Sequence, residues 1–293
     1  MRTRRGREGK PVPEWMARAL KLADKLVFSK IRERLGGRLR YAISGAAPLG
    51  RELAHFYEAI GLPLIEGYGL TEGGVVTLNP LTEPRPGSIG KALAGVEVKV
   101  TDEGELCIKA PCLFSGYYND AEATAAVLRD GWLYTGDIAE IDADGFITIT
   151  GRKKELIVSS NGKKIYPARI ESLFKVEPLI NQVLLVGDRQ PYLTALITLN
   201  TANAETLGTE LRGRSMAEMA IAPVVLKEVD AAIKRVNQNL PGFEQIRRFR
   251  VLERDFTIEL GELTPTMKVR RKQVLDNFKE IVSQLYLGRE EMV

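Results

Sequence analysis

The stretch Ile65-Glu66-Gly67-Tyr68-Gly69-Leu70-Thr71-Glu72 decides the fold, and it follows an apolar run that begins at Leu62. The apolar run predicts a buried strand, and the Gly-x-Gly after it predicts a tight turn whose backbone approaches a ligand closely. Tyr68 offers a flat ring, while Thr71 and Glu72 offer a hydroxyl and a carboxylate. These groups suit a nucleotide with Mg²⁺, and Glu72 is the candidate metal ligand. Taken alone, a glycine-rich turn after a strand is more often only a turn.

Four further motifs accompany this stretch in order along the chain. They are Ser44-Gly45-Ala46-Ala47-Pro48-Leu49, Tyr134-Thr135-Gly136-Asp137, Gly151-Arg152-Lys153-Lys154-Glu155-Leu156 and Leu263-Thr264-Pro265-Thr266-Met267-Lys268. The ordered set resembles the adenylate-forming superfamily of acyl-CoA synthetases, peptide-synthetase adenylation domains and luciferases. Within it, Leu35-Gly36-Gly37-Arg38-Leu39-Arg40 looks most like the long-chain fatty acid branch. The resemblance runs from about Pro13 to about Leu287.

The resemblance implies an α/β and α+β fold. Residues 1–151 would form the remainder of a large AMP-binding domain, with a sheet remnant and a small β subdomain, and residues 152–293 a mobile C-terminal lid domain. The implied activity is that of a fatty acid–CoA ligase, which activates a fatty acid with ATP to acyl-AMP and then forms a thioester with coenzyme A. The implied cofactors are ATP, Mg²⁺ and coenzyme A, and the implied partner is the fatty acid.

The resemblance also assigns the nucleotide site. Its expected members are Gly45, Ala46, Ala47, Gly67, Tyr68, Gly69, Thr71, Asp137, Arg152 and Lys268. Small residues after Ser44 would let the backbone approach the base. Asp137 follows a strand and a Thr-Gly turn, and a carboxylate held there can accept both hydroxyls of a ribose. Arg152 is a planar donor that could pair with Asp137 or with the ribose.

Lys268 is the expected catalytic residue of the first half-reaction, together with Thr71 and Glu72. Negative charge builds on the phosphoryl oxygens when a carboxylate attacks the α-phosphate, and a lysine on a mobile domain can stabilise that charge. The alternative is that Lys268 belongs to a solvated basic cluster at a helix start, with Arg270, Arg271 and Lys272.

Three residues are expected to serve the change between the two half-reactions. Lys154 falls where the family has its hinge, although a surface lysine in a charged run explains the same letter. Gly162 and Lys163 would line the path of coenzyme A after the domain rotates. A type I′ turn between two strands at Asn161-Gly162 remains the alternative interpretation.

One expected motif is missing from the first 43 residues: the phosphate-binding loop rich in Ser, Thr and Gly that ends in Pro-Lys-Gly. The chain therefore resembles the C-terminal portion of an acyl-CoA synthetase. We expect little or no ligase activity from it alone. A complementing N-terminal half or a homo-oligomer would cover the apolar faces that a divided domain exposes.

Composition bounds these hypotheses. With 293 residues and 44% hydrophobic content, the chain can bury a core in two domains. A net charge of +4 does not require a nucleic-acid partner. Cys107, Cys112 and the single His55 provide too few ligands for zinc, and His55 receives no role. No apolar run approaches the ~18 residues of a membrane span, so we expect a cytoplasmic protein whose membrane contact is peripheral, through its lipid substrate.

Hydrophobic spacing predicts the elements that carry these motifs. Helices are expected over 13–35, 51–60, 167–174, 217–239 and 271–287. Strands are expected over 40–44, 62–65, 156–159, 183–187 and 193–199, with short alternating strands over 87–110 and a hairpin over 138–150. The basic residues 1–10 are expected to be disordered.

Other functions are weighed against the ligase. A non-catalytic remnant that binds nucleotide or acyl-CoA in a regulatory or structural role is the alternative. A peptide-synthetase module is disfavoured because no carrier-protein segment with a modifiable serine follows Leu287. A nucleic-acid binder ranks last, because the basic runs lack interleaved aromatic residues.

Overall fold

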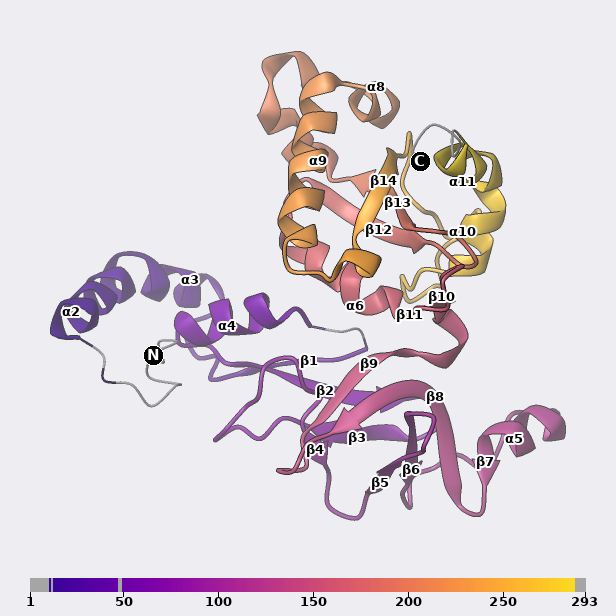
Figure 1. Ribbon diagram of the computed structural model, residues 1–293. Coiled ribbons are helices and arrows are strands. Elements are labelled where there is room, and N and C mark those ends of the chain that lie inside the picture. Colours follow the sequence, from indigo (N-terminus) through magenta and orange to yellow (C-terminus); the bar gives the residue numbers. More distant parts are fainter. Residues whose placement is uncertain (1–10, 12, 47–48, 288–293) are drawn as a thin grey trace. The chain divides into compact units, whose positions relative to one another are not determined.

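The computed structural model describes residues 11, 13–46 and 49–287 (Figure 1). The chain divides into two compact units, one ending at Lys154 and the other beginning at Glu155. Residues 1–10 and Ala47, for which disorder and a place in the nucleotide site are expected, lie outside the described residues. The predicted mixed α/β and α+β fold class is confirmed.

Among the residues that the structure describes, the first unit contains two sheets and three α-helical segments. Its helices are α2 (Glu14–Ala23), continued by the π-helix η1 (Asp24–Phe28) and α3 (Ser29–Arg34), then α4 (Arg51–Ala59) and α5 (Ala121–Val127). One sheet has the order β1 (Ala42–Ser44), β2 (Leu64–Leu70), β3 (Gly74–Leu78) and β4 (Lys91–Ala92). The other has the order β5 (Glu97–Val100), β6 (Glu105–Lys109), β8 (Trp132–Ile141) and β7 (Leu128–Arg129), with β9 (Ile147–Arg152) also paired to β8.

The predicted turn at Gly67-Tyr68-Gly69 is wrong, because β2 continues through all three residues to Leu70. The turn falls at residues 71–73, and β3 returns antiparallel with a bulge between Tyr68 and Gly69. The glycines instead allow the backbones of β2 and β3 to lie close together. A Cβ on Gly69 would lie 2.5 Å from the Gly74 carbonyl oxygen, and real Cβ atoms do not come that close.

One apolar core joins the two sheets of the first unit. It contains Val76 of β3, Leu106 and Ile108 of β6, Ala139 of β8, and Ile147 of β9, all nearly inaccessible to solvent. Backbone hydrogen bonds from Ile89 and to Gly90 pair the loop before β4 with Ile147. This shared core brings the end of β2 near β8 and β9, the strands that carry the candidate ribose residues.

In the described residues, the second unit contains a three-stranded sheet covered by helices and a separate two-stranded sheet formed by its first two strands. Its strands are β10 (Ile157–Val158), β11 (Lys164–Ile165), β12 (Ile180–Val186), β13 (Leu193–Leu199) and β14 (Ile246–Val251). Its α-helices are α6 (Pro167–Ser172), α7 (Thr201–Ala204), α8 (Met216–Ala220), α9 (Pro223–Asn237), α10 (Arg271–Asn277) and α11 (Lys279–Tyr286). Short 3-10 segments lie at Lys153–Glu155, Leu173–Val176, Glu205–Leu207, Thr209–Leu211 and Gly242–Glu244.

The central strand β13 confirms the predicted alternation. Side chains at 193, 195, 197 and 199 contribute to the core beneath α6 and α9, whereas Leu196 contributes to a second core with α10 and α11. Figure 1 shows these helices on opposite sides of the β12–β14 sheet. Every residue of β13 is buried. Alternate side chains of this strand therefore point into two different cores, rather than into one core and into solvent.

Two predicted long helices are interrupted. The helix expected over 217–239 is divided into α8 and α9, because Pro223 lacks an amide hydrogen and occupies the first turn of a new helix. The helix expected over 271–287 is divided at Phe278, which leaves helical geometry with φ −109° and ψ 23°. Within the described ranges, no helix is long and apolar enough to span a membrane.

The substitution Gly69→Ala is expected to destabilise the first unit by about 1–3 kcal/mol, because the added methyl must displace the β3 backbone. Urea unfolding monitored by tryptophan fluorescence measures this, since Trp15 and Trp132 both lie in the first unit. Gly45→Ala is the matched control, because its nearest contact would be an ordinary 3.5 Å. Equal stability of the two variants would contradict the close-approach explanation.

Candidate functional site

Three strands of the first unit converge on the Asp137 carboxylate. Asp137 lies on β8 and is 4% exposed. Tyr68 of β2 donates its hydroxyl hydrogen to Oδ2 at 2.5 Å, and Arg152 of β9 places Nε 2.9 Å from Oδ1. Asp137 and Arg152 are directly opposed in the β8–β9 ladder. The structure thus brings together three of the residues predicted for the nucleotide site.

A bulge in β8 presents this carboxylate. Glu105 of β6 pairs with Ile138, and Cys107 pairs with Tyr134, so Thr135, Gly136 and Asp137 lie opposite a single β6 residue. Gly136 adopts a φ of +72°, which glycine tolerates without strain. The Asp137 amide donates to Thr135 Oγ1 at 3.1 Å. Bulges of this kind re-aim side chains beside functional sites.

The Tyr68 phenol is held protonated. Burial raises its pKa, the negative charge of Asp137 raises it further, and the hydrogen bond to Asp137 adds to both. The phenol therefore acts as a donor to Asp137 throughout the physiological pH range. This bond fixes the Tyr68 ring relative to β8.

The small residues of the Ser44 motif lie next to this cluster. Strand β1 is parallel to β2 with Ser44 opposite Glu66, and a Cβ on Gly45 would lie 3.5 Å from the Gly67 carbonyl oxygen. Ala46 adopts the left-handed conformation with φ +68°. Gly45, Ala46, Gly67 and Tyr68 therefore form one continuous stretch of surface at the end of β1 and along β2.

Thr71 and Glu72 lie at the β2–β3 turn, beyond Gly69. Thr71 is exposed, and Glu72 accepts a hydrogen bond from the Tyr117 hydroxyl at 2.8 Å. The Glu72 carbonyl accepts the Phe114 amide at 2.7 Å. Across residues 11, 13–46 and 49–287, no three His, Cys, Asp or Glu side chains gather as a metal site. Glu72 is the carboxylate that this turn offers to a metal ion.

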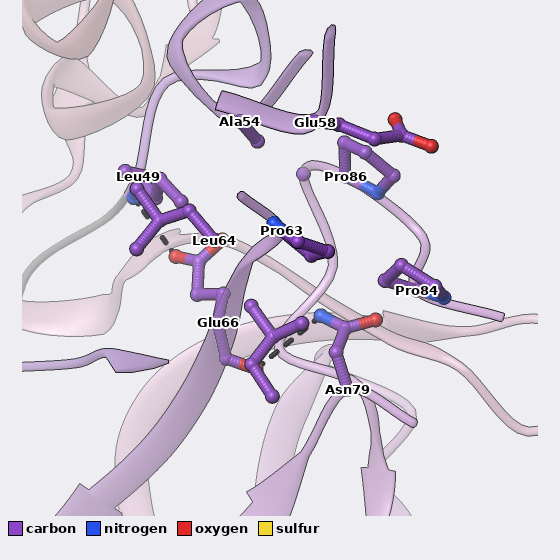
Figure 2. Close-up of a pocket in the computed structure, with 11 residues that line it drawn as sticks. Leu49, Ala54, Glu58, Pro63, Leu64, Glu66, Asn79, Pro84 and Pro86 are labelled. Carbon is purple, nitrogen blue, oxygen red and sulfur yellow. Dashed lines mark hydrogen bonds between the residues drawn. The ribbon is translucent and has the colours of Figure 1, made fainter. Parts of the chain in front are cut away.

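A small pocket is lined by the first residues of β2, by residues of α4 and by the loop that contains Pro84 and Pro86 (Figure 2). Glu66, 7% exposed, accepts the Leu49 amide at 2.8 Å, and its carbonyl accepts from the Asn79 side chain. Figure 2 shows both bonds, with Pro63, Pro84 and Pro86 along the same wall. Glu66 thereby fixes Leu49, two residues before the start of α4.

The residues predicted for the hinge and for coenzyme A lie at the unit junction and in the second unit. Lys154 is exposed within the 3-10 turn Lys153–Glu155, where the first unit ends. Gly162 has φ +72°, and Lys163 Nζ lies 5.7 Å from the centre of the Phe243 ring. A β10–β11 hairpin does form, but it is not type I′, because Asn161 lacks the positive φ that this turn requires.

Lys268 lies on a loop closed at its base. The Thr264 amide donates to the Lys268 carbonyl at 2.8 Å, and the Lys268 amide donates to Thr264 Oγ1 at 3.0 Å. Below them, the Arg270 amide donates to the Glu262 carbonyl at 2.7 Å. Lys268 itself is exposed. Its catalytic role stays a prediction.

The buried carboxylate of Glu262 anchors the start of the Lys268 loop. It is fully buried and receives two hydrogen bonds from Arg254, each at 2.7 Å, and one each from the Thr257 amide and Asn277. Burial alone would raise the pKa of Glu262, but the bonds from Arg254, Asn277 and Thr257 together lower it below the ordinary value.

Sequence reasoning missed four residues of these networks: Glu66, Glu105, Tyr117 and Glu262. Glu66 lies within a quoted motif and Glu262 directly before one, whereas Glu105 and Tyr117 lie outside them. The partners of Glu105 and Tyr117 are 31 to 48 residues away. The available signal was weak: an acid at the start of an apolar strand pattern, as Glu105 is before Leu106 and Ile108, needs a partner if it is buried.

The family descriptions agree with this arrangement. Residues 10–118 match the family AMP-binding enzyme, and residues 154–290 match the AMP-binding enzyme C-terminal domain. The chain therefore belongs to the adenylate-forming superfamily of AMP-binding enzymes.

Within the superfamily, the chain groups with the acyl-CoA synthetases. It is 43% identical over 267 residues to long-chain-fatty-acid–CoA ligase FadD15 of Mycobacterium bovis, covering 90% of this chain and 44% of that protein. It is 35% identical over 294 residues to the human long-chain-fatty-acid–CoA ligase ACSBG1, covering 91% of this chain and 41% of that protein. The chain thus spans less than half the length of these relatives.

Solved structures give the same fold. The A domain of carboxylic acid reductase from Segniliparus rugosus, in complex with AMP and a carboxylic acid, matches with a TM-score of 0.73 and 25% identity. The match covers 96% of this chain and 44% of that one. The adenylation domain of the carboxylate reductase from Mycobacterium chelonae matches with a TM-score of 0.71 and 25% identity, covering 91% and 41%.

The stability of the second unit is expected to depend on Glu262 at low pH. Because its folded-state pKa lies below the ordinary 4.5, ionised Glu262 stabilises the folded unit above that pH, and the contribution is lost as pH falls through the folded value. Thermal unfolding followed by circular dichroism between about pH 5 and about pH 3 measures the loss. Glu262→Gln should have a shallower dependence than wild type, and the exposed control Glu259→Gln should keep the wild-type slope.

Proposed function

We propose that this chain is the C-terminal portion of a long-chain acyl-CoA synthetase. The reaction is ATP-dependent activation of a long-chain fatty acid to acyl-AMP, followed by thioester formation with coenzyme A. Similarity to named long-chain-fatty-acid–CoA ligases supports the substrate class. The observation that carries the proposal is the Tyr68–Asp137–Arg152 cluster beside Gly45 and Gly67.

The Asp137 cluster suits a ribose. Each carboxylate oxygen has two acceptor sites, and the bonds from Tyr68 and Arg152 use one on each oxygen. The remaining capacity can accept the two ribose hydroxyls. Arg152 is more than half exposed and can also reach a hydroxyl oxygen. The Tyr68 ring and the backbone at Gly45 and Ala46 would then flank the adenine.

Glu72 suits Mg²⁺. Magnesium commonly takes one or two protein carboxylates and completes its shell with waters and phosphate oxygens, so Glu72 can serve as its protein ligand without a cage of further side chains. Bound there, Mg²⁺ would neutralise charge on the ATP phosphates. Tyr117 orients the Glu72 carboxylate, and the exposed Thr71 hydroxyl can donate to a phosphate oxygen.

The two half-reactions require two arrangements of the second unit. We assign Lys268 to the first, where its ammonium would stabilise charge on the α-phosphate as acyl-AMP forms. We assign Gly162 and Lys163 to the second, along the path of coenzyme A. Lys154, at the end of the first unit, is the proposed pivot. We further infer that full turnover uses protein that the relatives carry beyond the matched region, including a phosphate-binding loop.

Asp137→Asn should weaken AMP binding about 10- to 100-fold, because losing a charge-assisted hydrogen bond costs about 1.5–3 kcal/mol. Isothermal titration of the purified chain with AMP measures the affinity directly. Asp144→Asn is the control, because Asp144 is an exposed carboxylate in the β8–β9 hairpin, away from the cluster. An unchanged AMP affinity in Asp137→Asn would refute the ribose assignment.

Lys268→Ala should slow acyl-AMP formation by about 10²–10³-fold, the usual effect of losing one electrostatic donor. Fatty-acid-dependent release of pyrophosphate measures this step, with the N-terminal portion of a relative supplied in trans. Thioester formation from added acyl-AMP should remain near wild type. Lys272→Ala, in the same basic cluster, should leave both steps unchanged. Equal losses in both steps would show that Lys268 serves folding or general binding instead.

A further inference from the structure

Glu105 satisfies an amide that the β8 bulge leaves without a ladder partner. In the bulge, Gly136 cannot pair regularly with β6, and its amide donates instead to Glu105 Oε1 at 3.0 Å. Glu105 is 8% exposed, so no bulk water replaces this bond. An unsatisfied buried amide is costly, and the carboxylate therefore fixes the bulge geometry. Asp137 is the next residue along β8, and its direction depends on this geometry.

The other oxygen of the same carboxylate binds the chain that leads to the unit junction. Lys153 Nζ lies 3.2 Å from Glu105 Oε2. Lys153 stands between Arg152, which pairs with Asp137, and Lys154, where the first unit ends. A second acid, Glu103, also pairs with Lys153 at 2.6 Å, but it is 74% exposed. Glu103 makes the shorter contact, but an ion pair between two exposed side chains contributes little, and so the partner expected to anchor Lys153 is the buried Glu105.

We propose that Glu105 is a positioning residue that links the nucleotide site to the junction between the two units. One oxygen holds the bulge that directs Asp137 toward the nucleotide. The other holds Lys153 and so keeps the last residues before the proposed pivot attached to the first unit. The inference rests on the proposed function for the roles of Asp137 and Lys154, while the bonds to Gly136 and Lys153 belong to the structure alone.

Only a carboxylate performs both tasks. A glutamine at this position keeps one oxygen, which can accept the Gly136 amide, but its amide nitrogen is a donor and cannot accept from the Lys153 ammonium. A leucine accepts neither. Glu105→Gln therefore separates the two tasks, and Glu105→Leu removes both. Glu103→Gln is the matched control, since it deletes the exposed partner of Lys153 and leaves Glu105 in place.

The first experiment tests the junction without any ligand. Trypsin cleaves after Lys153 and Lys154, and mass spectrometry of timed digests gives the cleavage rate at that position. Glu105→Gln should be cleaved there about fivefold faster than wild type, and Glu103→Gln at the wild-type rate. Equal acceleration by both substitutions, or none by Glu105→Gln, would overturn the assignment of Glu105 as the anchor of Lys153.

The second experiment tests the bulge through AMP affinity. Glu105→Leu should raise the dissociation constant for AMP about tenfold, whereas Glu105→Gln should keep it within about twofold of wild type. A merely structural role for Glu105 would instead weaken both variants in proportion to their loss of stability, which Trp132 fluorescence during unfolding records. Equal affinity of Glu105→Leu and wild type would overturn the positioning role.

The outcomes also separate this inference from the function on which it rests. If the wild-type chain does not bind AMP, the proposed nucleotide site fails, and the cleavage comparison between Glu105→Gln and Glu103→Gln still decides the junction. If wild type binds AMP and the Glu105 variants behave alike in both assays, the function stands and the link is wrong. Should Glu105→Leu not fold, Glu105→Gln and Glu103→Gln carry the decision.

Discussion

The first unit depends on the burial of one negative charge. A carboxylate that is 4% exposed, as Asp137 is, must be paired and hydrogen-bonded, because an isolated buried charge is very costly. Its partners come from separate strands, Tyr68 on β2 and Arg152 on β9, so satisfying Asp137 fixes these strands relative to β8. Because Arg152 remains half in solvent, the cluster keeps an open side. An interaction that organises the sheet is thereby also available to a ligand.

Backbone irregularities follow from that requirement. A regular β8 would alternate its side chains between the two faces, and the bulge at Thr135–Asp137 interrupts this alternation. Interruption leaves amides without ladder partners, and nearby side chains, Glu105 and Thr135, accept them. Glycine appears where the backbone must adopt a positive φ, as at Gly136, or where another strand comes too near for a Cβ, as at Gly69.

Periodicity and motif order predicted much of the fold, and the reasons for the failures are physical. The alternation in β13 was readable because each face packs on a core. Gly67-Tyr68-Gly69 was misjudged because a glycine needed for close strand approach and one needed for a turn look identical in sequence. Pro223 divides a helix that apolar spacing alone made continuous. The partners of Glu105 lie about 31 and 48 residues away, and no local pattern specifies pairs at such separations.

In both units a buried carboxylate fixes the backbone next to a candidate site residue. In the first, buried Glu105 fixes the backbone that presents Asp137; in the second, buried Glu262 fixes the base of the loop that presents Lys268. In each case the anchoring carboxylate accepts hydrogen bonds from the backbone and from a basic side chain. Lys268 stays exposed at the end of a loop whose base is held in place. Under the proposed function, Lys268 would meet phosphate in only one of two arrangements. The combination suits that task, because a mobile loop start would lose orientation and a buried side chain would lose reach.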